Sequence, residues 1–148
     1  VTALIGVGMS APLIPLFVLF MRVQTPSVVR IRRMLERFLT PLLRKLTLPK
    51  ALFLSLCAGI GEELLFRGLL QEGMALLLGN PVALLSASLV FGVLHAITPL
   101  YAVYATLLGI YLGGLFAITG SLFVPILTHT IYDTVGLLLL ARRSSPRH

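Results

Sequence analysis

Long apolar runs dominate the hydrophobic pattern of the 148-residue chain, and short polar or proline-containing breaks separate them. A helix needs about 20 mostly apolar residues to span a bilayer. Pro12 and Pro15 predict a kink in the first run, and Gly79 to Pro81 predict a tight turn between the second and the third. The pattern therefore predicts an all-α, polytopic membrane helix bundle of about five transmembrane helices. The five runs are 1–21, 51–78, about 81–98, about 99–119 and about 121–141.

The segment between the first two runs, residues 22–50, has a different pattern. Apolar side chains recur there at helical spacing among basic ones, which is typical of an amphipathic helix lying in the membrane interface. We expect this helix to break at Pro41. The favoured role of its charges is to set the topology and to attract anionic lipid. Nucleic-acid binding is disfavoured, because the cations alternate with a lipid-facing stripe. The stripe consists of Ile31, Leu35, Phe38, Leu42 and Leu46.

The composition supports the membrane assignment. The chain is 57% hydrophobic and 11% charged, whereas a typical soluble domain carries about 25% charged residues. Residues 22–50 hold eight basic residues and one acidic residue, and this charge of +7 equals the net charge of the whole chain. The positive-inside rule places residues 22–50 in the cytoplasm. Five alternating spans then place Arg142, Arg143 and Arg147 on the same side.

Two smaller features complete the picture of the chain. Cys57 is the one cysteine, so an intrachain disulfide is excluded, and we interpret Cys57 as a packing residue. The first apolar run has no basic segment before it. We therefore interpret it as a span and not as a cleaved signal peptide.

Seven ionisable residues lie inside the predicted spans, where each costs about 2–3 kcal/mol or more unless it is paired or hydrated. Glu63 and Arg67 are four residues apart with the acid first, which is the favourable order for an ion pair. Glu62 points about 100° away from Glu63, so it has no local partner, and its pKa is expected to be raised. Such a carboxylate is suited to act as a general base. Glu72 falls at the opposite interface and is expected to be solvated. The seven are Glu62, Glu63, Arg67, Glu72, His95, His129 and Asp133.

Two further pairs of residues share a helix face at a spacing of four. His95 follows Phe91, and His129 precedes Asp133. Either pair could have a purely structural role: His95 as a polar contact, and His129 with Asp133 as an intrahelical hydrogen bond. However, polar groups on three different helices all need polar partners within the lipid bilayer. The helix rise places Glu62, His129 and Asp133 roughly 17, 19 and 13 Å from the cytoplasmic ends of their spans. We therefore expect one cavity, open to the cytoplasm, to hold them together.

Small residues predict close helix packing in two places. Gly59 and Gly61 flank the acidic pair, and Gly109 and Gly113 are four residues apart in the fourth run. Residues without a Cβ let the backbones of membrane helices approach each other. We expect a neighbouring helix at each place.

Three motifs, taken in order along the chain, resemble those of the CPBP family. They are Glu62-Glu63-x-x-x-Arg67, Phe91-x-x-x-His95 and His129-x-x-x-Asp133. This family comprises the type II CAAX prenyl endopeptidases and the bacteriocin-processing and immunity-associated intramembrane proteases. The resemblance covers about residues 50–141. It suggests three parts: an N-terminal span with the basic segment (1–49), a protease core (50–141) and a short basic tail (142–148).

The resemblance implies roles for the site residues. Glu62 would activate a water for attack on a peptide carbonyl, and His95 would orient that water. His129, together with Asp133, would stabilise the oxyanion or fix the site. Asp133 stands where the eukaryotic members have Asn, so as an oxyanion donor it would have to be protonated. The supporting residues would be Glu63, Arg67 and Phe91.

The favoured function is therefore that of an intramembrane endopeptidase in a bacterial plasma membrane. Its substrate would be a membrane-associated peptide, either a prenylated CAAX protein or a bacteriocin-type peptide. One alternative is a non-catalytic self-immunity or binding protein of the same fold. Another is a small proton-coupled transporter, which is disfavoured because no inverted repeat is visible. Glu62, His95 and His129 could also hold zinc, but the H-E-x-x-H signature is absent, and we favour catalysis without a metal.

Overall fold

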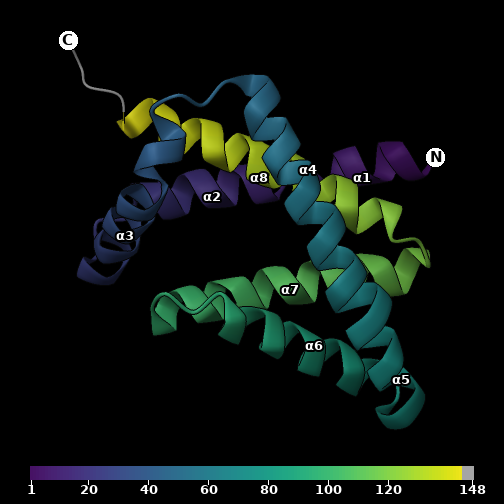
Figure 1. The fold of residues 1–148 in the computed structure, drawn as a ribbon. Coiled ribbons are helices and arrows are strands. Elements are labelled where there is room, and N and C mark those ends of the chain that lie inside the picture. The colour runs from purple at the N-terminus through teal and green to yellow at the C-terminus, as the bar shows by residue number, and fades with distance from the viewer. Residues whose placement is uncertain (145–148) are drawn as a thin grey trace.

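The computed structural model describes residues 1–144 as a bundle of helices, and no strand occurs in that range. The all-α prediction is confirmed (Figure 1). Arg147, which belongs to the predicted basic tail, lies outside the described residues. The elements are α1 (Thr2–Ser10), α2 (Leu13–Arg22), α3 (Pro26–Leu43), α4 (Leu48–Glu63), the π-helical segment η1 (Leu64–Gln71), α5 (Glu72–Leu78), α6 (Asn80–Leu94), α7 (Pro99–Thr119) and α8 (Phe123–Ser144).

Three of the five predicted spans are long and apolar enough to cross a membrane: Thr2–Arg22, Pro99–Thr119 and Phe123–Arg143. The kink predicted in the first span occurs between α1 and α2, next to Pro12. Helix α6 has only 15 residues and rises about 22 Å, which is less than the roughly 30 Å of a bilayer core. Residues 48–78 form one continuous helical segment, but its charges interrupt its apolar character.

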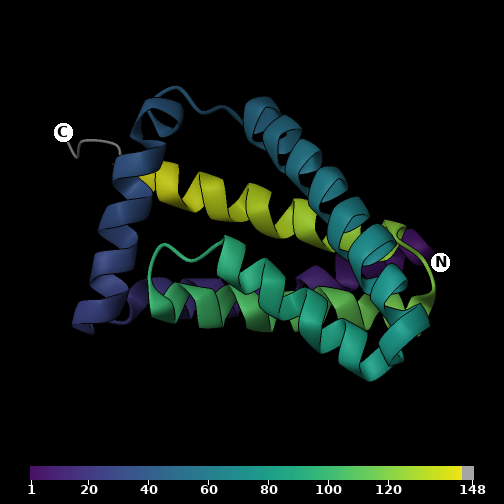
Figure 2. The same ribbon diagram turned by 60° about the horizontal axis from the view of Figure 1, so that its bottom comes forward.

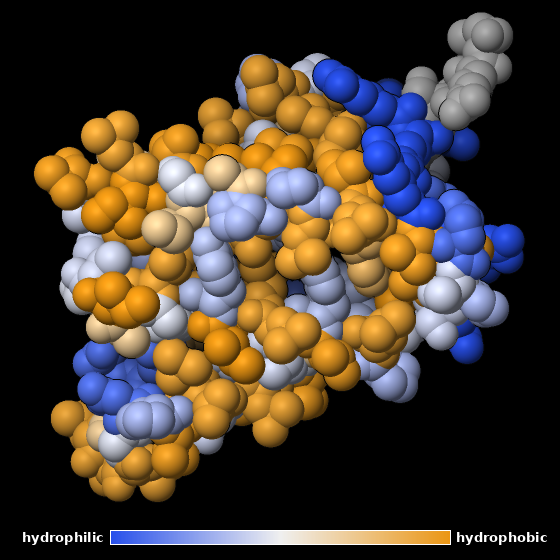
Figure 3. Space-filling view, turned by 180° about the vertical axis from the view of Figure 1, so that it is seen from behind, coloured by the Kyte–Doolittle hydropathy of each residue, from blue (hydrophilic) through white to orange (hydrophobic). Residues whose placement is uncertain are grey.

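The surface supports the assignment of this chain as a membrane protein. Large apolar side chains point outward along most of the helices, and Leu76, Leu77 and Ile118 are each more than four fifths exposed. Figure 3 shows that apolar residues cover most of one face, while hydrophilic residues concentrate at the end formed by α3 and the last turns of α8, with a second hydrophilic patch over α5. Such an apolar surface is stable against lipid and unfavourable against water.

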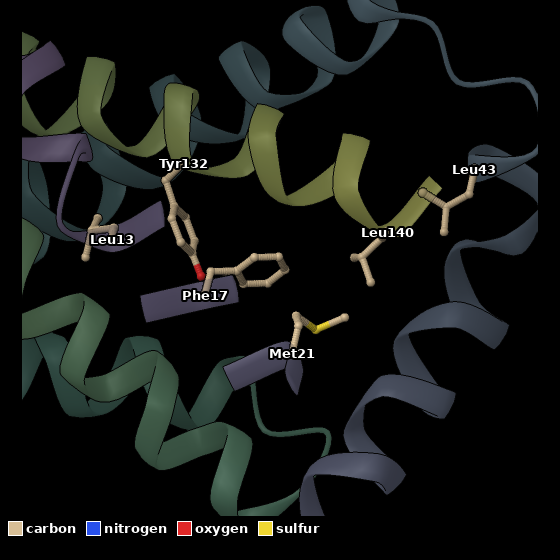
Figure 4. Packing of buried hydrophobic residues seen from close by; sticks show 6 residues of the cluster. All are labelled: Leu13, Phe17, Met21, Leu43, Tyr132 and Leu140. Carbon is tan, nitrogen blue, oxygen red and sulfur yellow. The ribbon is translucent and has the colours of Figure 1, made fainter. Parts of the chain in front are cut away.

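Helix α3 is the predicted amphipathic helix, and it packs at one end of α2 and α8. The break expected at Pro41 is wrong: the helix includes Pro41 and continues to Leu43. Proline removes one intrahelical hydrogen bond and crowds the preceding turn, but the helix continues for two more residues to Leu43, which is buried in the core cluster with Leu140. Figure 4 shows Leu13, Phe17 and Met21 of α2 facing Tyr132 and Leu140 of α8, with Leu43 of α3 beside Leu140.

The arrangement of the remaining helices brings distant segments together. The segment formed by α4, η1 and α5 crosses α8 and also packs against α6 (Figures 1 and 2). Helices α6 and α7 form an antiparallel hairpin, and Gly79, which has a φ of 79°, makes the predicted tight turn before α6. The point where this crossing segment meets α8 and the hairpin holds the ionisable residues of the predicted spans other than Glu72.

Candidate active site

Six side chains from three parts of the chain meet inside the bundle. Glu62, Glu63 and Arg67 come from the junction of α4 and η1. His129 and Asp133 come from α8, and His95 lies directly after the end of α6. His95 was expected within a span, but α6 ends at Leu94. The sequence-predicted site residues therefore lie together, and Glu72 is exposed elsewhere on α5.

The Glu63–Arg67 ion pair, which the sequence predicted, lies buried at the bottom of the site. Arg67 Nη1 donates to Glu63 Oε1 at 2.8 Å, and the two side chains are 2% and 0% exposed. Arg67 Nη2 donates to the backbone carbonyl of Gly109 on α7 at 2.9 Å. Both ends of the guanidinium are thus occupied, which a buried cation requires.

Gln71 extends this polar row and was missed by the sequence analysis. It is buried, and its Nε2 donates to the Gly113 carbonyl at 3.2 Å, one turn beyond the Arg67 contact with Gly109. In an α-helix every fourth residue drifts about 40° around the axis. The wider turns of the π-helix counter that drift, so Glu63, Arg67 and Gln71 all face inward. Gln71 follows Arg67 by four residues, and this spacing was the signal from which its place in the row could have been predicted.

His129 is surrounded by three carboxylates. Its Nδ1 lies 2.8 Å from Glu63 Oε1, and because an ionised carboxylate only accepts, Nδ1 carries the proton that is donated. The opposite nitrogen, Nε2, lies 3.3 Å from Asp133 Oδ2 and 3.9 Å from Glu62 Oε2. The imidazole is 4% exposed. Glu63 therefore fixes both the tautomer and the orientation of His129.

Glu62 and His95 form the open side of the site. Their side chains are 31% and 33% exposed, and Glu62 Oε2 lies 3.6 Å from His95 Nε2. His95 Nδ1 lies 2.8 Å from the Phe91 carbonyl, which can only accept, so a neutral His95 has its lone pair on Nε2, facing Glu62. Glu62 has no partner on its own helix, as expected, but the imidazoles of His95 and His129, from other helices, both lie beside it. A raised pKa of Glu62 was expected from the sequence because no partner was found for this carboxylate, and that reason no longer holds.

Phe91 connects the buried and the open sides of the site. Its ring stacks on His95 with 4.2 Å between centroids and meets His129 edge-on at 6.5 Å. The Arg67 guanidinium carbon lies 5.0 Å from the Phe91 ring centroid, in cation–π range. One apolar side chain thus packs against three of the polar ones.

An apolar cavity of about 270 Å³ adjoins the site at Asp133. Asp133 is 33% exposed and lines the cavity together with Tyr101, Tyr104 and Tyr132. The hydroxyls of Tyr104 and Tyr132 hydrogen-bond to each other. Ser55, whose buried Oγ has no partner among the described residues, also lines this cavity. These tyrosines and Ser55 were not singled out from the sequence, although polar side chains within apolar spans were a usable signal.

Gly59 sets the distance between α4 and α8. A Cβ on Gly59 would lie 2.8 Å from Thr130 Oγ1 and 3.3 Å from the Ile126 carbonyl, whereas a Cβ on Gly61 would meet nothing within 4 Å. The expected close contact is thus confirmed for Gly59 and wrong for Gly61. At the other predicted place, Gly109 packs on Ser88, and Gly113 packs on Gln71.

We expect Gly59→Ala to destabilise the protein by about 1–3 kcal/mol, because overpacking forces α4 away from α8. The position of Glu62 should change with it, since Glu62 follows Gly59 by less than one turn. Gly61→Ala is the matched control and should be neutral or stabilising by up to about 1 kcal/mol. Thermal unfolding in detergent measures both. Equal effects of the two substitutions would contradict the close packing at Gly59.

The donor set of the site suits a metal chemically, but its arrangement does not. Within residues 1–144, no three His, Cys, Asp or Glu side chains are placed so that they could hold a metal ion together. Zinc ligands lie about 2.0–2.2 Å from the metal, so two tetrahedral ligands are about 3.4 Å apart. The separations of Glu62 Oε2 from His95 Nε2 and His129 Nε2, 3.6 and 3.9 Å, are wider. We therefore derive no step through a metal.

Comparison with known proteins gives two similarities. Residues 44–135, more than half of the chain, match the family model described as type II CAAX prenyl endopeptidase Rce1-like. The Bacillus subtilis (strain 168) protein YpbD is 36% identical over 94 residues, which are 62% of this chain and 46% of that protein. The chain thus spans about half the length of this curated relative. No solved structure matches the chain.

Proposed function

Since the chain belongs to the type II CAAX prenyl endopeptidase Rce1-like family, we propose that it is an intramembrane endopeptidase. It hydrolyses a peptide bond of a membrane-associated substrate with a water activated by Glu62. One observation carries this proposal. Glu62 Oε2 and His95 Nε2 are two partly exposed acceptors 3.6 Å apart, and a water can donate one proton to each of them.

The reaction needs a base, an orienting group and a stabiliser of negative charge. Glu62 takes a proton from the water while the water oxygen attacks the carbonyl carbon. The C–N bond then breaks, Glu62 returns the proton to the leaving nitrogen, and the products are a carboxylic acid and an amine. His95 Nε2 accepts a hydrogen bond from the second O–H of the water, which keeps that proton, and so orients the lone pair of the nucleophile.

His129 and Asp133 stabilise the oxyanion of the tetrahedral intermediate. Because its Nδ1–H is bonded to Glu63, His129 can donate from Nε2 only as an imidazolium. Asp133 can donate only when its carboxyl is protonated. Asp133 lines the apolar cavity, and His129 Nε2 lies 3.3 Å from its carboxylate, so the carbonyl to be attacked would be positioned between the cavity and Glu62.

The cavity favours a substrate with an apolar segment, of the CAAX or the bacteriocin type. Aromatic and aliphatic side chains make up most of its lining, and Ser55 offers a polar contact inside it.

We infer that the protein resides in a bacterial plasma membrane with residues 22–50 and the end of α8 in the cytoplasm. A shared hydrogen-bond acceptor supports a common side: Arg32 of α3 and Arg143 of α8 both donate through Nη1 to the carbonyl of Met21, the latter at 3.1 Å.

The proposal is tested with a reporter peptide anchored in proteoliposomes by an apolar segment. We expect the purified full chain to cleave it in oxygen-18-labelled water and to place one labelled oxygen atom in the new carboxyl terminus. Mass spectrometry of the products measures this. Tight binding of the peptide without any product would instead support a non-catalytic binding or self-immunity protein, and would overturn the proposal.

Metal removal gives a second test of the mechanism. With both imidazoles neutral, the site holds three carboxylates and one guanidinium, a net charge of −2 that two imidazole protons or one divalent cation would balance. We expect purified, active protein to retain its cleavage rate after chelator treatment. Elemental analysis should give far less than one equivalent of zinc. Near one equivalent, with activity lost on stripping and restored on adding zinc, would contradict a metal-free mechanism.

A further inference from the structure

The cations of this chain are concentrated at one end of the molecule. Of the 12 Lys and Arg residues, Arg67 lies in the site, and all the others belong to residues 22–50 or follow Ala141. The structure brings the two basic segments together: Arg32 of α3 and Arg143 of α8 both donate through Nη1 to the carbonyl of Met21, the latter at 3.1 Å. Figure 3 shows the resulting hydrophilic end beside an apolar surface.

A groove of about 640 Å³ lies between α3 and α8 at this end. Four arginines line it, two from each helix: Arg32, Arg33, Arg142 and Arg143. Its one acidic lining residue is Glu36, so the groove has a net charge of +3. Within residues 1–144, Glu36 makes no ion pair within 4 Å. The groove therefore holds guanidinium groups without the carboxylates that would normally balance them.

The guanidinium groups retain unused donors. Arg32 uses Nη1 for Met21 and Nη2 for Gln24 Oε1 at 3.2 Å, while Arg143 uses Nη1 for the same Met21 carbonyl. Arg33 and Arg142 are exposed and make no hydrogen bond to another described residue. Guanidinium forks match the paired oxygens of a phosphate. An anion with several oxygens would satisfy these donors and relieve the repulsion between the four cations.

The position of the groove identifies the source of the anion. It lies at the ends of two candidate spans, Thr2–Arg22 and Phe123–Arg143, where lipid headgroups lie. Val29 and Leu139 give it an apolar edge along which acyl chains can pass. Basic pockets between helices at such a boundary are typical headgroup sites. We propose that this four-arginine groove binds the phosphodiester headgroup of an anionic phospholipid and so ties α3 to α8. The proposal is independent of the cleavage chemistry.

A diffuse attraction between a basic helix and an anionic membrane is the competing explanation. Arg30 and Arg37 allow the two to be separated. Both are exposed on α3, line a different hollow of the surface and do not line the groove. A diffuse attraction depends on the total charge, so losing any two arginines should weaken it equally. A built site depends on which two are lost.

The test compares two double variants of the full chain in a zwitterionic detergent. Arg33→Gln with Arg142→Gln removes two groove cations that make no hydrogen bond within the described protein, so folding should be retained. Arg30→Gln with Arg37→Gln removes the same charge outside the groove. The thermal unfolding midpoint is measured while short-chain phosphatidylglycerol is titrated, with short-chain phosphatidylcholine and inorganic phosphate as parallel arms.

We expect phosphatidylglycerol to raise the midpoint saturably for the unmodified protein and for the Arg30/Arg37 variant. The Arg33/Arg142 variant should need about tenfold or more phosphatidylglycerol for the same rise, because two charge-assisted contacts are lost. An equal weakening in both variants, or no saturable rise in the unmodified protein, would overturn the proposal. A rise of the same size with inorganic phosphate would overturn the assignment to a lipid.

Discussion

Replacing Glu62 by Gln is expected to lower the cleavage rate by about 10²–10⁴-fold, the usual contribution of a general base. Glutamine keeps the shape of the side chain but cannot take a proton from water. Glu62 is 31% exposed and lies 3.6 Å from His95, so the substitution leaves no buried charge unpaired. The thermal unfolding midpoint should therefore change little. The initial rate of reporter cleavage in proteoliposomes measures the effect.

Glu72→Gln is the matched control for Glu62→Gln. Glu72 is an exposed acid on the same long helical segment, and within the described residues no ion pair joins it to the site. We expect this variant to cleave the reporter at the rate of the unmodified protein. Full activity of folded Glu62→Gln would rule out Glu62 as the base, even if the protein proved to be a protease.

The largest effects on stability are expected from the buried ion pair. Glu63→Gln leaves the Arg67 guanidinium without its carboxylate, and Arg67→Gln leaves the Glu63 carboxylate without its guanidinium. Removing one partner of a buried pair costs about 3–5 kcal/mol. Glu63→Gln also removes the charge that holds His129 Nδ1, so activity should fall further than stability predicts. Thermal and denaturant unfolding in detergent, together with the cleavage rate, measure the two effects.

The double variant Glu63→Gln with Arg67→Gln tests whether the pair acts as a unit. It leaves neither charge stranded, so its destabilisation should be smaller than the sum of the two single losses. The remaining amides can still hydrogen-bond to His129 and to the Gly109 carbonyl. Strictly additive losses would mean that the two residues are energetically independent, in spite of the 2.8 Å contact between them.

The features that local spacing determines could be predicted from the sequence. The Glu63–Arg67 pair, the shared face of Phe91 and His95, and the turn at Gly79 each depend on residues a few positions apart. The helical class followed from the length of the apolar runs, and the boundaries of α7 match the fourth run. The distance of each residue from the cytoplasmic end of its predicted span was enough to suggest that Glu62, His129 and Asp133 would meet.

The features that depend on contacts between helices could not be predicted. The π-helical turns of η1 are stabilised by the fit of Arg67 and Gln71 to α7 carbonyls, which no local pattern reveals. The partners of Glu62 lie 33 and 67 residues away along the chain, so the local analysis treated it as unpaired. Gly59 and Gly61 are equivalent in the sequence, and only the direction of α8 distinguishes them. Pro41 was expected to break its helix, but the packing of Leu43 extends that helix beyond it.

The placement of Arg67 on the same helix as Glu63 also affects how the chain is made. A ribosome completes residues 48–78 well before α8, so this segment meets the membrane while His129 has not yet been synthesised. Each isolated charge would cost about 2.5–3.5 kcal/mol during insertion at the translocon. A pair formed within the segment needs no later helix and reduces that cost at once. The same contact that anchors the finished site would thus lower the cost of placing this segment in the bilayer, whereas Glu62 must wait for the imidazoles of His95 and His129.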